Sequence, residues 1–229
     1  MRLLAFETAT EHLSVALWTD GALIERHEAL PNSGAERLLP WVHEILAEAS
    51  ISLQQIDGIA FGAGPGGFTG LRLACGVTQG LAFGLNIPVV SISTLQALAL
   101  ASDERFVWAC LDARMNEIYC AAYEVNGDEV REVIPPVCVG DSVSPAPTGE
   151  NWVGVGDGFI AHGDDLRARK PDILKVLPNL YPTAAAVARL AAPRFARGEG
   201  INAALAQPIY VRDKVALTTQ ERLAKGGLN

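Results

Sequence analysis

A glycine-rich stretch from Gly62 to Leu73 reads GAGPGGFTGLRL. It follows an apolar run from Ile56 to Phe61, which predicts a buried strand, and leads into a long apolar helix expected to begin at Phe68. Glycine admits backbone angles closed to other residues and lets the main chain approach a ligand or a second segment closely. A glycine-rich loop before a helix N-terminus is also a common phosphate-binding arrangement. The first hypothesis is therefore a nucleotide enzyme.

Composition limits the class of protein. The chain has 229 residues, of which 49% are apolar, enough for one large core or two modest ones. A net charge of −8 without a basic stripe argues against independent binding of nucleic acid. The four cysteines lie in apolar runs without CxxC spacing, so we expect reduced thiols in a cytoplasmic protein. We expect no membrane contact, because no apolar run reaches spanning length.

The segments on either side of the glycine-rich stretch extend the pattern. Three short strands within residues 1–28 predict a hairpin series. A helix is expected from Ser33 to Ala49, with a capping box at its start. With a further strand at 89–91, the strand, glycine loop and long helix form a βαβ unit.

A similar pattern returns later in the chain. The strands at 4–7 and 13–18 correspond to segments 109–112 and 118–123, which lie 105 residues further on. Each copy contains an acidic turn after its first strand and a glycine turn after its second. Three matched features at a nearly constant offset predict an internal duplication.

Four motifs resemble the bacterial TsaB (YeaZ) family and occur in the same order: FETATEHLSVALW from Phe6, GPGGFTGLRL from Gly64, LDARMNEIY from Leu111 and PIYVRDKVA from Pro208. This family is a non-catalytic relative of TsaD in the actin, sugar-kinase and Hsp70 superfamily. The resemblance implies an α/β fold of two duplicated actin-like ATPase (ribonuclease H-like) subdomains, each a mixed sheet flanked by helices. We expect an N-terminal subdomain at 1–103 and a smaller one at 104–229, with the tail packing back on the first.

The same resemblance implies a scaffold function. It predicts a chain that binds and orders TsaD, the subunit that modifies tRNA, helps to recruit the small ATPase TsaE, and also forms a homodimer. We expect contact with tRNA only through that complex, no cofactor on this chain, and ATP and metal on the partner subunits. Metallopeptidase activity, an older description of such proteins, would need an HxxxH pair. By our placement Thr94 and Leu98 occupy those positions, and leucine cannot bind a metal.

The helix after the glycine loop indicates where a partner would bind. Three of its glycines stand four residues apart and form a bare ridge, although each costs about 1 kcal/mol of helix stability relative to alanine. The ridge is either buried within its own domain or faces a partner chain, and we favour the partner. On the helix from Ser33, an indole beside charged residues is expected to face solvent and to anchor the interface. The predicted interface residues are Trp41, Leu73, Gly76, Val77, Gly80 and Gly84.

A nucleotide site is the alternative. The first acidic turn keeps a carboxylate and hydroxyls, but it has Glu in place of Asp and Ala9 in place of glycine. These polar side chains either satisfy turn amides, which we favour, or form a vestigial nucleotide site. The residues of that site would be Glu7, Thr8, Thr10, Gly64, Gly66 and Asp112. The corresponding function is an ATPase or kinase of the same superfold that acts alone.

Overall fold

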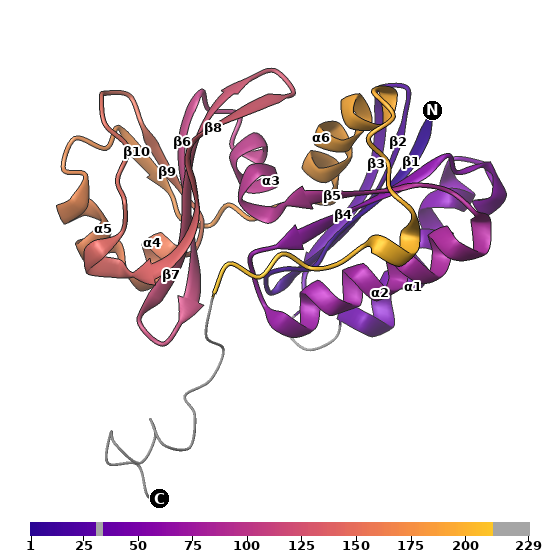
Figure 1. The fold of residues 1–229 in the computed structure, drawn as a ribbon, viewed down its shortest axis with the longest axis horizontal. Coiled ribbons are helices and arrows are strands. Elements are labelled where there is room, and N and C mark those ends of the chain that lie inside the picture. The colour runs from indigo at the N-terminus through magenta and orange to yellow at the C-terminus, as the bar shows by residue number, and fades with distance from the viewer. Residues whose placement is uncertain (31–33, 213–229) are drawn as a thin grey trace, which may run out of the picture.

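The computed structural model describes residues 1–30 and 34–212, which form two five-stranded sheets flanked by helices (Figure 1). This architecture confirms the predicted fold class. The predicted helix start at Ser33 lies outside the described residues, as do residues 213–216 of the last motif. No helix within the described ranges is long and apolar enough to cross a membrane.

The first sheet has the strand order β3-β2-β1-β4-β5. Its strands are β1 (Arg2–Glu7), β2 (His12–Thr19), β3 (Ala22–Ala29), β4 (Gly58–Gly64) and β5 (Val89–Ser93). Strand β1 pairs antiparallel with β2 and parallel with β4, as a hairpin followed by a βαβ crossover requires. Strand β4 extends through Gly64, so the first three residues of the glycine-rich stretch are strand rather than loop.

Both faces of the first sheet are covered. Leu4 and Phe6 belong to the core beneath α1 (Gly34–Glu48) and α2 (Phe68–Leu85), whereas Ala5 packs against α6 (Ala184–Ala196). Burial on both faces explains why β1 is continuously apolar rather than alternating. The sequence division placed α6 in the second unit, but this helix covers the first sheet (Figure 1). Periodicity reveals an apolar helix face without indicating which sheet that face will cover.

The second sheet repeats the topology of the first. Its order is β10-β9-β6-β7-β8. If the strands of each unit are counted from its N-terminus, both sheets have the order third, second, first, fourth, fifth. The strands are β6 (Phe106–Arg114), β7 (Glu117–Asn126), β8 (Glu129–Gly140), β9 (Val153–Val155) and β10 (Lys175–Leu177). An antiparallel hairpin and a parallel fourth strand recur in both sheets, which confirms the duplication.

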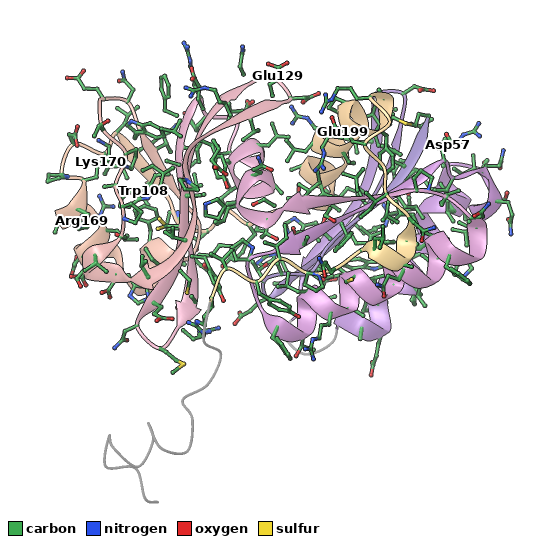
Figure 2. The ribbon with its side chains drawn as sticks, in the orientation of Figure 1. Asp57, Trp108, Glu129, Arg169, Lys170 and Glu199 are labelled. Atoms are coloured by element: carbon green, nitrogen blue, oxygen red, sulfur yellow. The ribbon has the colours of Figure 1, made fainter. Side chains whose placement is uncertain are left out.

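Short helices cover the second sheet. Helix α3 (Thr94–Ala101) packs on one face, while α4 (Gly158–Ala161) and α5 (Gly163–Arg169) pack on the other. Trp108, labelled in Figure 2, is buried between β6 and α4. Sequence analysis did not predict these three helices or β10, because segments this short carry no resolvable period.

After α6 the chain turns back along the first unit. The short helix η3 (Ala203–Leu205) packs on α2, and the following residues run toward the second unit (Figure 1). This path brings the end of the described chain to the junction of the two sheets.

Candidate functional site: a cleft and a bare helix face

The glycine-rich loop encloses the acidic turn that follows β1. The Thr8 hydroxyl donates to the Gly70 carbonyl at 2.7 Å, and the Gly67 amide donates to the Ala9 carbonyl at 2.7 Å. A Cβ on Gly70 would lie 1.8 Å from the Thr8 carbonyl oxygen, and one on Gly62 would lie 1.8 Å from a carboxylate oxygen of Glu7. These glycines therefore let two segments of the chain itself pack closely.

Glu7 is fully buried beneath this loop. Its Oε1 accepts a hydrogen bond from the Ala9 amide at 2.8 Å, and its Oε2 accepts one from the Thr94 hydroxyl at 3.3 Å. Burial raises the pKa of the Glu7 carboxyl from 4.5 to about 7, because removal from water outweighs the hydrogen bonds that favour its charged form. A large part of this buried group is therefore protonated near neutral pH.

We expect the Glu7→Gln variant to lose less stability than the parent chain as the pH rises from 4.5 to 7. In the parent, the raised folded-state pKa means that stability from Glu7 is present below pH 4.5 and is lost as the pH rises through about 7. The loss is roughly 3 kcal/mol when complete, whereas glutamine has no proton to release. Denaturant unfolding of both chains from pH 4.5 to 8 measures the difference. Parallel pH profiles would contradict the raised pKa of Glu7.

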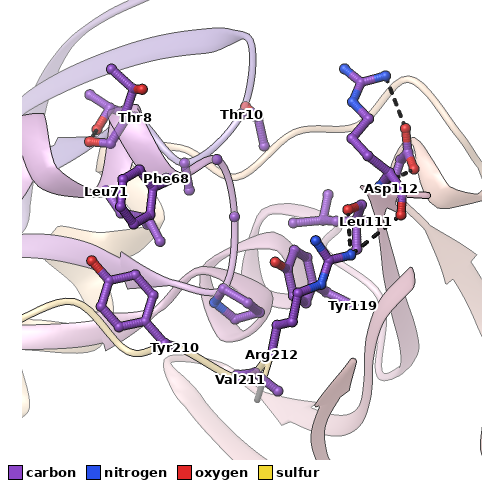
Figure 3. Close-up of a pocket in the computed structure, with 18 of the residues that line it drawn as sticks. Thr8, Thr10, Phe68, Leu71, Leu111, Asp112, Tyr119, Tyr210, Val211 and Arg212 are labelled. Atoms are coloured by element: carbon purple, nitrogen blue, oxygen red, sulfur yellow. Dashed lines mark hydrogen bonds and ion pairs between the residues drawn. The ribbon is translucent and has the colours of Figure 1, made fainter. Parts of the chain in front are cut away.

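A cleft of about 430 Å³ lies between the two units (Figure 3). Most of its walls come from four segments that are distant in sequence: the acidic turn at 8–11, the glycine-rich loop and start of α2 at 65–71, the end of β6 at 111–114 and the tail at 209–212. Four predicted nucleotide-site residues line it, namely Thr8, Thr10, Gly66 and Asp112. Glu7 and Gly64 lie behind the lining, and a Cβ on Gly64 would meet the Ile209 carbonyl oxygen at 2.6 Å.

Asp112 is held by neighbouring groups of its own unit. Its Oδ1 accepts from the Arg114 amide at 2.7 Å, and the Arg114 guanidinium lies 3.1 Å from Oδ2. The amide of Asp112 donates to Asp157 Oδ1 at 2.9 Å, and burial raises the pKa of Asp157. Thr10 likewise accepts from the His12 amide at 3.2 Å. These hydrogen bonds agree with the interpretation that the acidic-turn side chains satisfy main-chain groups.

Several residues that line the cleft were missed by sequence analysis: Tyr119, Asp157, Tyr210 and Arg212. Asp157 carried a usable signal, because it lies between Gly156 and Gly158 in a second glycine-rich turn, directly after β9. There a Cβ on Gly156 would stand 2.3 Å from the Cys110 carbonyl oxygen, a close approach like that at Gly70. The two tail residues gave no comparable signal, since an extended segment does not specify where it packs.

The positions compared with a metal-binding pair are part of the core. Thr94 is buried, and its hydroxyl accepts from the Gly64 amide at 3.2 Å. Leu98 is buried in the apolar cluster between α3 and the second sheet. Across residues 1–30 and 34–212, no three His, Cys, Asp or Glu side chains are grouped so that they could hold a metal ion.

The glycine ridge of α2 faces solvent. Gly76, Gly80 and Gly84 are exposed, and a Cβ on any of them would have no neighbour within 4 Å among the described residues. Leu73 and Val77 beside the ridge are half-buried. Two arrangements were considered from sequence, burial of the ridge within its own domain and contact with a partner chain. In the described residues the ridge is not buried within its own domain.

The expectation that Trp41 faces solvent is wrong. Only 3% of Trp41 is exposed, and its indole packs in the first core with Leu38 and Ile45. Position 41 lies at the border of the apolar stripe, three residues after Leu38 and four before Ile45, so the large ring turns inward. The charged residues used to assign the wet face are exposed, and Glu44 and Glu48 pair with Arg26 of β3, but this charged surface lies beside the indole and does not include it.

Two exposed apolar side chains were not predicted. Phe83 on α2 is 78% exposed, and Leu39 on α1 is 46% exposed. Phe83 stands three residues after Gly80 and seven after Gly76, so helical spacing places it on the glycine face. That spacing was readable from sequence, whereas the exposure of the face was not. Large exposed apolar groups of this kind are typical of binding surfaces.

The repeated sheet order and the cleft between the sheets define a protein of the duplicated actin-like class. A family model described as TsaD, tRNA N6-adenosine threonylcarbamoyltransferase, matches residues 32–142. The tRNA threonylcarbamoyladenosine biosynthesis protein TsaB of Escherichia coli K12 is 38% identical, over 94% of this chain and 96% of that protein. The TsaB protein of Haemophilus influenzae is 36% identical, over 94% of this chain and 95% of its own length. This chain belongs to the TsaB family.

A solved structure supports the same relationship. It is that of an uncharacterized Pseudomonas aeruginosa protein with similarity to peptidase YeaZ, and it matches this chain with a TM-score of 0.86 and 38% identity. The match covers 92% of this chain and 99% of that one. The likeness therefore includes both units.

Proposed function

We propose that this chain is a non-catalytic subunit of the tRNA threonylcarbamoyladenosine machinery in the cytoplasm. It binds and orders TsaD, helps to recruit TsaE, and pairs with a second copy of itself when TsaD is absent. ATP and metal belong to the partner subunits, and tRNA is met only through the complex. The names of the TsaB relatives support the pathway, and the exposed face of α2 supports the scaffold role.

The observation that carries this proposal is an uncovered glycine ridge with a phenylalanine beside it. Gly76, Gly80 and Gly84 allow another helix to approach the α2 backbone closely, and Phe83 offers a large apolar side chain to a pocket on the partner. Leu73 and Val77 extend this surface. Trp41 is no longer part of it, because its side chain is buried.

The same surface can serve both partners. The TsaD family model matches a range that includes α1 and α2. A TsaD subunit would then present a similar pair of helices, so homodimer and heterodimer would form related four-helix packings. A self-complementary patch of this kind is the usual basis of a two-fold dimer.

We expect reconstituted tRNA modification to depend on this chain and on Phe83. The assay combines TsaD, TsaE, ATP, Mg²⁺ and the remaining pathway components with the parent chain, with the Phe83→Asp variant, or with no added chain. A buried carboxylate at the helix contact would be uncompensated, so the variant should perform like the omission. Ile160→Asp, which alters an exposed apolar residue of the second unit, is the matched control. Full modification without the chain would refute the scaffold role.

An ATPase or kinase that acts alone is the second candidate, and it is favoured by the four predicted nucleotide-site residues that line one cleft. Calorimetry with ATP and Mg²⁺, together with phosphate-release measurements on the isolated chain, separates the two functions. Steady turnover would favour the enzyme, and its absence the scaffold. A gel shift with tRNA, with and without TsaD, tests direct RNA binding, which the net charge of −8 disfavours.

A further inference from the structure

The tail crosses from one unit to the other in an extended conformation. It is first attached to the first unit, where Gln79 donates to the Ala206 carbonyl at 2.8 Å. Next, the Ile209 amide donates to the Ala63 carbonyl at 2.7 Å. The carbonyl of Ile209 then lies over Gly64, in space that a side chain at that position would fill.

Tyr210 lies against the start of α2. Its ring centroid is 6.0 Å from that of Phe68, and its hydroxyl accepts a hydrogen bond from Arg72 Nε at 3.3 Å. The Arg72 guanidinium stacks over the other ring, 3.6 Å from the Phe68 centroid. The tyrosine is nonetheless 50% exposed, so this contact is a surface contact.

Arg212 reaches the second unit (Figure 3). Its Nη2 donates to the Ala113 carbonyl at 2.8 Å and lies 2.5 Å from Glu117 Oε2. The guanidinium also stands 5.9 Å from the centre of the Tyr119 ring. Only 17% of the Arg212 side chain is exposed, whereas its partner Glu117 is 40% exposed, so the arginine is enclosed and the carboxylate is not.

We propose that Ile209–Arg212 is a detachable strap, a peptide ligand carried by the chain itself that binds across both units and forms one wall of the cleft. The segment belongs to neither sheet, and it is held by a few hydrogen bonds and by the ion pair of Arg212 with the half-exposed Glu117 rather than by core packing. Elements held in this way open at a small fraction of the free energy needed to unfold a domain. Its release would uncover Gly64 and the main chain of Ala113 and Arg114 at the end of β6.

The test removes the strap from the chain and adds it back as a separate peptide. One chain ends after Gln207 and lacks the strap, and a control chain ends after Arg212 and keeps it. We expect a labelled peptide of residues 208–212 to bind the first chain and not the second, as measured by fluorescence anisotropy. The same peptide with Arg212→Ala should bind at least tenfold more weakly, because it loses both the ion pair with Glu117 and the hydrogen bond to the Ala113 carbonyl.

Full-length variants keep the test decisive if the shortened chain does not fold. Arg212→Ala should speed amide hydrogen exchange in residues 63–71 and 112–119 with an unchanged circular dichroism spectrum. Arg105→Ala, which removes an exposed arginine paired with Glu124, should leave both segments unchanged. Unaltered exchange in Arg212→Ala would overturn the proposal. So would equal peptide binding to the two shortened chains, or no binding to a folded chain that ends at Gln207.

Discussion

The Gly80→Leu variant is expected to remain a folded monomer and to lose association with TsaD and with itself. A Cβ at Gly80 meets nothing within 4 Å among the described residues, so the isolated chain has room for the side chain. A partner helix lying against the bare ridge would be displaced by the added volume. Overpacking a close contact costs about 1–3 kcal/mol, and 1.4 kcal/mol is about tenfold in affinity. We therefore expect the dissociation constant to rise by roughly a hundredfold.

The measurement is co-elution with TsaD and sedimentation of the chain alone over a range of concentrations. Gly163→Leu is the matched control, because that glycine is also open but lies on α5 of the second unit. It should associate like the parent. If Gly80→Leu binds TsaD as tightly as the parent, then the glycine ridge is not the interface.

The Gly70→Ala variant is expected to be strongly destabilised. The new methyl group would lie 1.8 Å from the Thr8 carbonyl oxygen, which is main chain and cannot move aside like a flexible side chain. The loop and the acidic turn must separate, and the hydrogen bond from the Thr8 hydroxyl to the Gly70 carbonyl is strained or lost. We expect the free energy of unfolding to fall by about 3 kcal/mol, measured by urea denaturation.

Gly76→Ala is the control within the same helix, and it should change stability in the opposite direction. Its Cβ would point into open space among the described residues, and alanine favours a helix by about 1 kcal/mol over glycine. The same glycine-to-alanine change, made at two positions of α2 that are six residues apart, should thus change the free energy of unfolding in opposite directions. Two losses of similar size would show that the packing at Gly70 does not differ from that at Gly76.

Sequence reasoning succeeded where a segment is long and periodic. Strands β1 and β2 and helix α2 lie close to their predicted positions, because each is a sustained apolar run bounded by polar or glycine-rich turns. It failed for Trp41, whose position on the border of a helix stripe was resolved only by packing against the sheet. It also missed Tyr210 and Arg212, since the route of an extended tail depends on the surface that it meets.

The gathering of the cleft residues follows from the duplication. Equivalent acidic turns leave equivalent strands, so Thr8 and Asp112 come to face one cleft once the two sheets stand side by side. Family membership and the internal duplication could be read from the residues themselves, because they depend on local patterns and on motif order. The path of α6 and the tail could not.

The glycines of the opening stretch and of the helix after it show most clearly what the sequence alone cannot determine. Sequence places them at regular spacing and indicates that something approaches the backbone closely at each. The folded contacts distinguish them: Gly62, Gly66 and Gly70 receive the chain's own acidic turn, whereas Gly76, Gly80 and Gly84 stand open. A glycine permits close approach but has no side chain with which to select what approaches. The identity of its neighbour is therefore a property of the tertiary structure alone.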